Sequence, residues 1–291
     1  MAHILPLPFV FTQSNLQSFF NCPYQFYLRY VLHFQWPAAQ ARDLLQFEAD
    51  RLAGARFHQL VYQLFLGISL PKLSQLAKND PDTRVATWFE AFTTTFPQTL
   101  PGELFPEYTL GVTLGGQELT AKYDLLQCDS GHFTIYDWKT SRRQPRKTWL
   151  AGQMQSRVFP LVLALHLDEI NQPFTELRMV YWEAAQPERP YIFKSTAQTL
   201  AEDQAFILAL MQKINRLSPA DFQKTDDIQR CQYCRYRSYC NRGTQPPEDD
   251  EAFIEAHYLE LAAEPEEDIF ETKLLDPSRG YTRLDHFSNS G

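Results

Sequence analysis

The chain has 291 residues, of which 44% are hydrophobic and 14% aromatic, so it can bury a sizeable core and is not a disordered chain. It contains no apolar run of about 18 residues, the length that a membrane helix needs, and its first residues lack the basic flank of a secretory signal. We therefore expect a cytoplasmic protein. Five unevenly spaced cysteines in such a chain favour metal or cluster ligation over a disulfide framework.

The net charge of −8 is unevenly distributed along the chain. Residues 247–291 hold 13 acidic and three basic residues, which leaves 22 acidic and 24 basic residues in 1–246. The sequence therefore predicts one near-neutral domain over residues 1–246 and an acidic tail over 247–291. Such a tail is typical of a solvated appendage, and a DNA-mimicking or partner-docking segment is the alternative.

Helical signals dominate the first third of the chain. Ser14 is expected to cap a short helix, and residues 24–34 are so aromatic that they must pack against a large surface. In residues 55–67, apolar side chains recur at helical spacing, which predicts a helix with one buried stripe and with His58 at its border.

The pattern changes to strands after residue 108. Residues 109–116, 117–127 and 132–140 read as a β-meander, and 175–184 as a fourth strand. Between them, 149–167 reads as a helix that Pro160 should kink or restart, and 196–217 as a further amphipathic helix. This order predicts an α/β or α+β fold, in which helices flank a mixed sheet.

Two carboxylates become neighbours in the second hairpin. If the chain turns at Ser130 and Gly131, residues whose numbers sum to 261 face each other, which pairs Asp124 with Asp137. Like charges in this position call for a cation, and oxygen ligands with open positions suit Mg²⁺ or Mn²⁺. Lys139, on the same face as Asp137, could hold the attacking water or a scissile phosphate. The alternative is an ordinary surface Asp–Lys pair.

Asp124 and the run Asp137-Trp138-Lys139-Thr140 resemble the catalytic signature of the PD-(D/E)XK nuclease superfamily. Over roughly residues 10–245, the chain is similar to the RecB-like exonuclease branch of this superfamily. The further matching positions are Ser14, Leu16, Cys22, Pro23, Phe26, His58 and Gln155. The resemblance implies a restriction-endonuclease-like fold with a helical N-terminal element.

The resemblance also implies roles for individual residues. It makes His58, Asp124, Asp137 and the Trp138 carbonyl metal ligands, Lys139 the group that positions water, and Gln155 the group that orients Lys139 or the phosphate. Glu107 matches an acidic position of the family less specifically. Two positions depart from the pattern. Ala121 replaces a glycine, which should slightly restrict the backbone, and Phe159 replaces a tyrosine and so lacks the hydroxyl of one DNA or active-site contact.

The cysteines form a second constellation. Cys231, Cys234 and Cys240 follow a C-x2-C-x5-C spacing, and Cys22 lies near the start of the same region. Four thiolates suit either a [4Fe–4S] cluster or tetrahedral zinc, and scattered core cysteines are the alternative. The pattern is similar to the iron-sulfur staple of AddB-type nuclease domains and CRISPR-associated exonucleases, which implies a [4Fe–4S] cluster that pins both ends of the domain together. Cys128 has no place in this scheme.

Basic residues follow each constellation. Arg142, Arg143, Arg146 and Lys147 come after the catalytic strand, and Arg235 and Arg237 lie among tyrosines near the cysteines. They suit phosphate contacts and base stacking, and solvated basic loops are the alternative reading.

The sequence thus predicts a Mg²⁺- or Mn²⁺-dependent DNA exonuclease of repair or recombination that acts on single strands or duplex ends. Any helicase motor must be a separate protein, because the chain has no nucleotide-binding G-x4-GK motif. The alternatives are a CRISPR spacer-processing nuclease that works with adaptation proteins, and a non-catalytic iron-sulfur scaffold that binds DNA.

Overall fold

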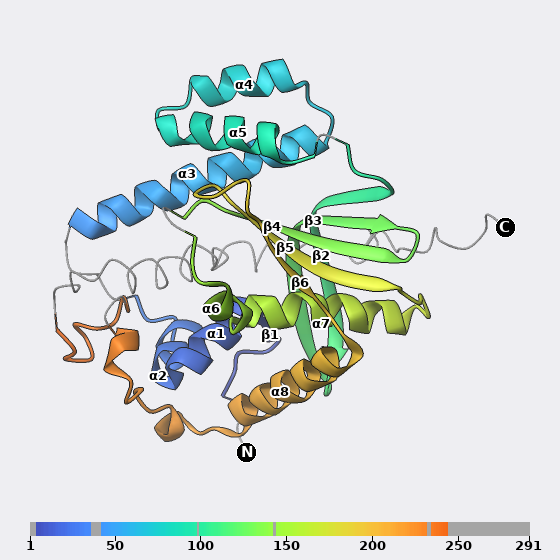
Figure 1. Ribbon diagram of the computed structural model, residues 1–291. Coiled ribbons are helices and arrows are strands. Elements are labelled where there is room, and N and C mark those ends of the chain that lie inside the picture. Colours follow the sequence, from blue (N-terminus) through green and yellow to red (C-terminus); the bar gives the residue numbers. More distant parts are fainter. Residues whose placement is uncertain (1–3, 36–41, 98, 142–143, 232–233, 244–291) are drawn as a thin grey trace.

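The computed structural model describes residues 4–35, 42–97, 99–141, 144–231 and 234–243 (Figure 1). The predicted phosphate-binding residues Arg142 and Arg143 and the acidic tail 247–291 lie outside these residues. Within the described part of the chain, no helix combines the length and the apolar character needed to cross a membrane.

A mixed sheet forms the centre of the fold, as predicted, but it has six strands where the sequence predicted four, because β1 and β6 were not predicted. The strands are β1 (Val10–Thr12), β2 (Glu103–Leu114), β3 (Gln117–Asp129), β4 (His132–Lys139), β5 (Glu176–Glu183) and β6 (Tyr191–Lys194). Their order is β1-β3-β4-β5-β6, with β2 on β3 as well. The pairs β1–β3 and β4–β5 are parallel and the others antiparallel. Ser130 and Gly131 make the predicted tight turn between β3 and β4, both at positive φ.

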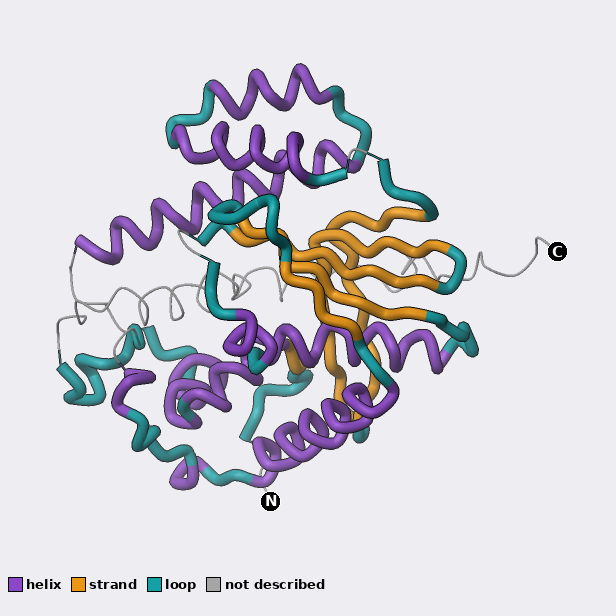
Figure 2. Tube along the Cα trace, viewed as in Figure 1, coloured by secondary structure: helices purple, strands orange, loops and turns teal. Residues whose placement is uncertain are grey.

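Helices cover both faces of the sheet (Figures 1 and 2). One face carries α3 (Arg42–Phe65), α4 (Leu70–Lys78) and α5 (Thr83–Thr95). The other carries α1 (Gln13–Asn21), α2 (Pro23–Phe26), α6 (Lys147–Ala151), α7 (Met154–Glu169) and α8 (Ala197–Arg216). A π-helical turn spans Tyr27–Val31, and 3-10 turns span Pro219–Asp221 and Ile228–Cys231. Because each face has its own helical cover, the sheet has two hydrophobic cores, and β4 is buried along nearly its whole length.

Two local predictions were wrong. The cap of α1 is Thr12, whose hydroxyl accepts from the Asn15 N–H, whereas Ser14 lies inside the helix and accepts from the Gln13 side chain. The second is the restart at Pro160, because the helical segment after β4 restarts at Met154 and α7 then continues through Pro160. A proline inside a helix costs about 3 kcal/mol, but each large side chain buried on α7 contributes about 1.5–3 kcal/mol, so packing outweighs the lost hydrogen bond.

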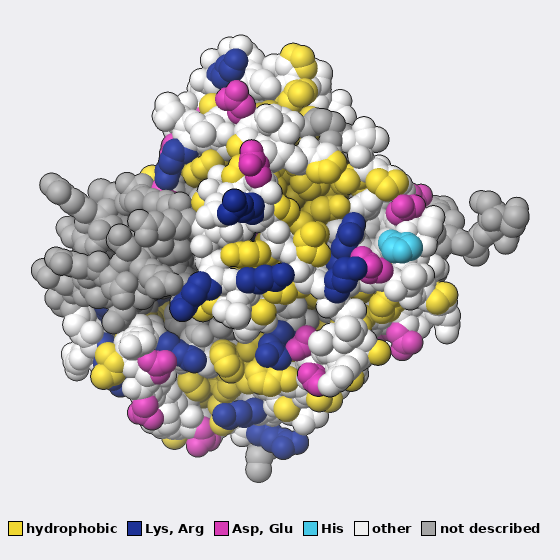
Figure 3. Space-filling view, in the orientation of Figure 1, with side chains coloured by type: hydrophobic (Ala, Val, Ile, Leu, Met, Phe, Trp, Pro, Cys, Tyr) yellow, Lys and Arg dark blue, Asp and Glu magenta, His cyan; other side chains and the backbone are white. Residues whose placement is uncertain are grey.

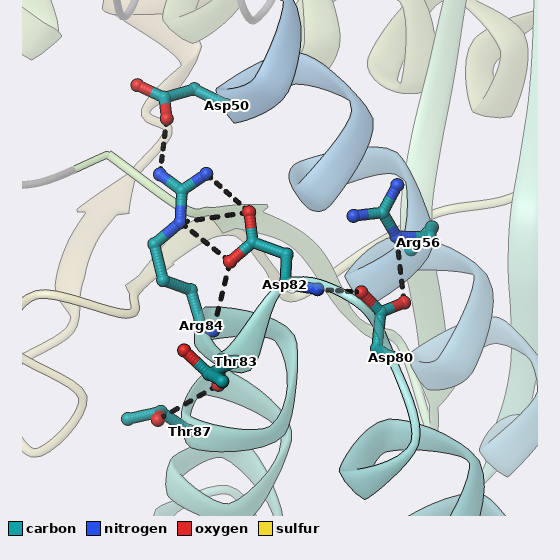
Figure 4. A network of polar contacts seen from close by, with 7 residues as sticks. All are labelled: Asp50, Arg56, Asp80, Asp82, Thr83, Arg84 and Thr87. Carbon is teal, nitrogen blue, oxygen red and sulfur yellow. Dashed lines mark hydrogen bonds and ion pairs between the residues drawn. The ribbon is translucent and has the colours of Figure 1, made fainter. Parts of the chain in front are cut away.

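A partly buried ionic network fixes α3 against the α4–α5 hairpin (Figure 4). Arg84, at the start of α5, donates to the buried Asp50 of α3 and to Asp82, which also caps α5. Asp80 accepts from Arg56 of α3 at 2.8 Å. Since buried charges must be paired, these contacts hold the long helix α3 in one position relative to the hairpin.

The N-terminus of α7 is capped from another helix. Its own cap residue, Gln153, makes no side-chain capping bond, and instead the Met154 N–H donates to Gln17 Oε1 of α1 at 2.9 Å. Gln17 also donates to Asn21 along α1. The bond across the two helices therefore fixes where α7 begins, one residue before Gln155.

We predict that Gln17→Leu lowers the free energy of unfolding by about 1–3 kcal/mol, because it leaves the buried Met154 N–H without a partner. Gln75→Leu is the matched control, since Gln75 makes the same Gln-to-Asn bond one turn along exposed α4 and caps no other helix. Urea unfolding of both variants measures the difference, and equal losses would contradict the capping role.

Candidate active site

The site lies where one edge of β3 changes partner. Residues 118–120 of β3 pair with β1, and residues 125–129 pair with β4. The β3–β4 register follows the predicted sum of 261, and its ladder ends at Leu125 and Tyr136. One step beyond, Asp124 Oδ2 accepts from the Trp138 N–H at 2.7 Å. The expectation that Asp124 directly faces Asp137 is corrected accordingly, because at this point a side chain takes the place of a ladder partner.

Three potential metal ligands meet at this point. The side chains of His58, Glu107 and Asp124 each place one ligand atom within 4.8 Å of the others. His58 reaches the sheet from α3, and its Nδ1 lies 3.2 Å from Asp124 Oδ1. Imidazole nitrogen and two carboxylates form a donor set that suits a divalent ion.

Glu107, which matches the family pattern less specifically, belongs to this group. Its neighbours Pro106 and Tyr108 pair with Leu125 and Tyr123, so Glu107 lies opposite Asp124 at a point where the ladder itself is interrupted. Paired residue numbers of β2 and β3 sum to 231 across the Gly115–Gly116 turn. A constant sum of paired residue numbers, which the sequence analysis applied to the β3–β4 hairpin, would have placed Glu107 opposite Asp124 in the β2–β3 hairpin as well. Its φ of 52° is the left-handed conformation, which costs an ordinary residue about 1 kcal/mol or more and recurs at functional sites.

This conformation coincides with a change in which core the side chains enter. Along β3, Tyr123 lies in the core beneath α7, Leu125 in the core beneath α3, and Leu126 again beneath α7. Alternate residues of a strand should enter the same core, but Tyr123 and Leu125 enter different cores. The in-and-out alternation of β3 therefore shifts by one residue at Asp124, opposite Glu107. This shift turns both carboxylates toward the site instead of into a core.

Asp137 and Lys139 are buried beside this group, on the face predicted for them. Lys139 Nζ lies 2.7 Å from Asp137 Oδ2, and Gln155 Nε2 of α7 donates to Asp137 Oδ1 at 2.6 Å. The Asp137 carboxylate is thus held by one cation and one amide. Gln155 contacts Asp137, whereas the sequence assigned it to Lys139 or the phosphate.

Close approach of α3 to β4 sets the position of His58. A methyl group at Gly54 would come within 2.9 Å of Thr140 Oγ1, so only glycine permits the observed approach without movement. Glycine inside a helix costs about 0.5–1 kcal/mol relative to alanine. That cost is offset by bringing His58, one turn further along α3, to Asp124 of the sheet.

Charge neighbours shift the titration of the three ligand side chains. Burial alone would lower the pKa of His58, but Asp124 outweighs it and the pKa is raised. Burial alone would raise the pKa of Asp124, but His58 and the Trp138 N–H bring it below its ordinary value. Burial and the charge of Asp124 raise the pKa of Glu107. The site therefore favours a charged His58–Asp124 pair, and metal binding would release the imidazole proton.

The four cysteines of the predicted cluster line one pocket. Cys22, Cys231, Cys234 and Cys240 share it with the cationic side chains Lys224, Arg230, Arg237 and Arg242. Burial raises the pKa of Cys231 and Cys240, while Lys224 and Arg242 oppose the shift. Arg230 also donates to the Phe20 carbonyl at the end of α1 at 2.8 Å, which joins the two ends of the described chain. Cys128 is buried elsewhere, in the core beneath α7.

The described basic residues that the sequence assigns to DNA binding lie near α6 and near the cysteine pocket. Arg146 precedes α6 and Lys147 begins it, and the Lys147 ammonium lies 5.3 Å from the Phe193 ring centre. Arg235 stacks on Tyr236, and Arg237 lines the cysteine pocket. Figure 3 shows lysine and arginine side chains spread over one face instead of gathered in one patch.

Residues 10–241 match the PD-(D/E)XK nuclease superfamily. The chain belongs to this superfamily. Its mixed sheet with helices on both faces confirms the predicted restriction-endonuclease-like fold. No curated protein matches the sequence.

Comparison with solved structures gives matches that include the following two. One is the crystal structure of a protein from Eubacterium rectale named "Putative exonuclease", with 14% identity and a TM-score of 0.51 over 82% of this chain and 91% of that chain. At this identity the likeness concerns the fold. The other, SSO0001, has 16% identity over 58% of this chain and 74% of that chain, and its TM-score of 0.32 is too low to indicate a shared fold.

Asp137→Asn should change how the stability of the metal-free nuclease depends on pH. Burial raises the pKa of Asp137 to about 6, although Lys139 opposes the shift. Because the unfolded value is about 3.9, ionisation favours the unfolded chain, and the wild type loses stability as pH rises from about 4 to about 6. We expect the difference in Tm to move in favour of the variant over that range.

Thermal melts in EDTA at several pH values measure this difference. Asp221→Asn is a control of opposite sign, because hydrogen bonds from Ser218 lower the pKa of Asp221. That variant should lose stability relative to the wild type as pH rises. Movement of both variants in the same direction would contradict the assignment.

Proposed function

We propose that this protein is a DNA exonuclease of repair or recombination that uses Mg²⁺ or Mn²⁺ and acts on single strands or duplex ends. Its membership of a nuclease superfamily supports hydrolysis of a phosphodiester bond. The observation that carries the proposal is the meeting of His58, Glu107 and Asp124 beside the buried Asp137–Lys139 pair.

The residues present fit a divalent metal. The Glu107 and Asp124 carboxylates, which lie with His58 within 4.8 Å of one another, repel each other, and a cation that they share removes this repulsion. We propose His58, Asp124 and Asp137 as ligands, joined by Glu107 and the Trp138 carbonyl. When bound, Mg²⁺ or Mn²⁺ would polarise a phosphoryl oxygen and lower the pKa of a bound water.

Lys139 and Gln155 complete the proposed machinery. Lys139 places a compact cation at the site, where it can orient the attacking water and stabilise the charge that develops on the phosphate. Gln155 holds Asp137 Oδ1, so that this carboxylate keeps one orientation while Oδ2 remains beside Lys139. Because α7 is capped by Gln17, the position of Gln155 is fixed from α1.

DNA would be bound mainly through its phosphates. Arg146 and Lys147 lie just after the catalytic strand, and Arg235 and Arg237 lie beside the cysteine pocket. These residues, together with Arg142 and Arg143, would contact a strand without reading its sequence.

A [4Fe–4S] cluster held by the four cysteines is the second part of the proposal. All four line a single pocket, and cations around it would offset the negative charge of four thiolates. Ligation would close a loop of roughly 200 residues. Because the entropic cost of bringing two chain segments together grows with loop length, a clip across so long a loop is expected to stabilise the fold more than a clip across a short one.

We predict that the wild type degrades end-labelled linear single-stranded DNA with Mg²⁺ or Mn²⁺ and spares covalently closed circles. Lys139→Ala and Asp137→Asn should lower the rate by about 100-fold or more, since they remove charge stabilisation and a metal ligand. Lys194→Ala, on the edge strand β6, is the matched control and should keep full activity.

Three outcomes decide between the candidates. Cutting of closed circles would contradict exonuclease action. DNA binding without cleavage by either metal would favour the non-catalytic scaffold. Cleavage only within a complex of integrase-type proteins would favour the spacer-processing nuclease.

For the cluster, we predict a brown protein with about four iron atoms per chain after anaerobic purification. Cys240→Ser should lose the colour and the iron, whereas Cys128→Ser should keep both, because Cys128 is buried in a different core. Iron analysis and visible absorption measure this. A colourless wild type with one zinc would overturn the cluster but leave the nuclease proposal intact.

A further inference from the structure

Glu183 is a fully buried carboxylate that the proposed machinery does not use. It ends β5 with an exposed fraction of 0%. A buried charge is costly unless a cation or hydrogen-bond donors compensate it. A carboxylate in this position therefore calls for an explanation in terms of its neighbours.

The neighbour of Glu183 on the next strand is the catalytic lysine. In the parallel β4–β5 register, Glu183 pairs with Lys139, and Tyr181 pairs with Asp137. Tyr181 lies in the same core as Ile135, so the odd-numbered side chains of both strands lie on one face. Paired strands are about 4.8 Å apart, which places the Glu183 and Lys139 side chains next to each other on the catalytic face.

Two hydrogen bonds hold the chain after Lys139 against the end of β5. The Ser141 hydroxyl donates to Glu183 Oε2 at 3.1 Å, and the Ala184 N–H donates to the Lys139 carbonyl at 2.8 Å. Ser141 is itself buried. The backbone on both sides of Lys139 is thereby fixed to β5 and cannot move independently of it.

Metal binding would change the balance of charge around Lys139. In the structure, Asp137 Oδ2 lies 2.7 Å from the Lys139 ammonium, while Gln155 holds Oδ1. A carboxylate that ligates a metal shares less of its charge with a lysine. Lys139 then needs a second anion nearby that does not bind the metal.

We propose that Glu183 is a positioning residue that holds the Lys139 ammonium on the catalytic face, through its negative charge and through its bond to Ser141. Its kinetic consequence rests on the proposed nuclease function. Its effect on Lys139 does not, because the two side chains are neighbours whatever reaction the site performs.

Charge and shape can be separated at this position. Glu183→Gln keeps the volume and an acceptor oxygen for Ser141 but loses the charge, whereas Glu183→Asp keeps the charge in a shorter side chain. We expect Glu183→Gln to lower kcat at least tenfold with KM for DNA within twofold, and Glu183→Asp to retain more activity than Glu183→Gln. Glu176→Gln, at the first position of the same strand, should be unchanged.

The proposal is overturned if Glu183→Gln is as active as the wild type, or if Glu183→Asp is the worse of the two. It is also overturned if Glu183→Gln instead raises the metal concentration needed for half-maximal rate, since Glu183 would then be a ligand. Cooperative melting of Glu183→Gln above the assay temperature, in the presence of metal, is the control that excludes simple loss of folding.

A measurement without turnover separates this inference from the nuclease proposal. Urea midpoints of metal-free Glu183→Gln, Lys139→Met and the double variant form a thermodynamic cycle. We expect the double variant to lose less than the sum of the single losses, because each single change leaves one charge less compensated. Additive losses would overturn the inference, even if the wild type cuts DNA. Non-additive losses in a protein that cuts no DNA would contradict only the nuclease proposal and leave the role of Glu183 intact.

Discussion

The hydrogen bond from the Trp138 N–H to Asp124 is the contact on which the site depends. It lies where β3 leaves β4 and takes β1 as its neighbour, so a side chain satisfies a backbone donor that a ladder would otherwise use. This arrangement fixes Asp124 and at the same time keeps the two strand ends apart. His58 from α3 and Glu107 from β2 reach Asp124 at this point, and Gln155 of α7 holds the neighbouring Asp137 of β4.

Burial of charge is the second constraint. Asp137, Lys139 and Glu183 are all buried within a short stretch of two neighbouring strands. Water cannot screen them, so each depends on a fixed partner, and the partners lie on rigid elements. A preorganised charge of this kind stabilises a transition state without reorganisation during the reaction.

The sequence was sufficient for the features that depend on local pattern. The strands, the β3–β4 register and the placement of Asp137 and Lys139 on one face follow from alternation and turn residues. Glu107 was undervalued because its backbone conformation is set by tertiary contacts. The sequence did not predict the α4–α5 hairpin or β1. A short helix or a three-residue strand is stabilised more by its packing against other elements than by the hydrophobic pattern of its own residues.

The position of the cysteine pocket has a consequence for biosynthesis. Its four thiols come from both ends of the described chain, Cys22 from the first helices and the other three from residues 231–240. During translation, the sheet and the proposed ligands His58, Glu107 and Asp124 leave the ribosome before Cys240 does. The pocket can therefore close only after the sheet has been synthesised, and a chain that stalls before Cys240 would carry the proposed active-site residues without this closure of its two ends.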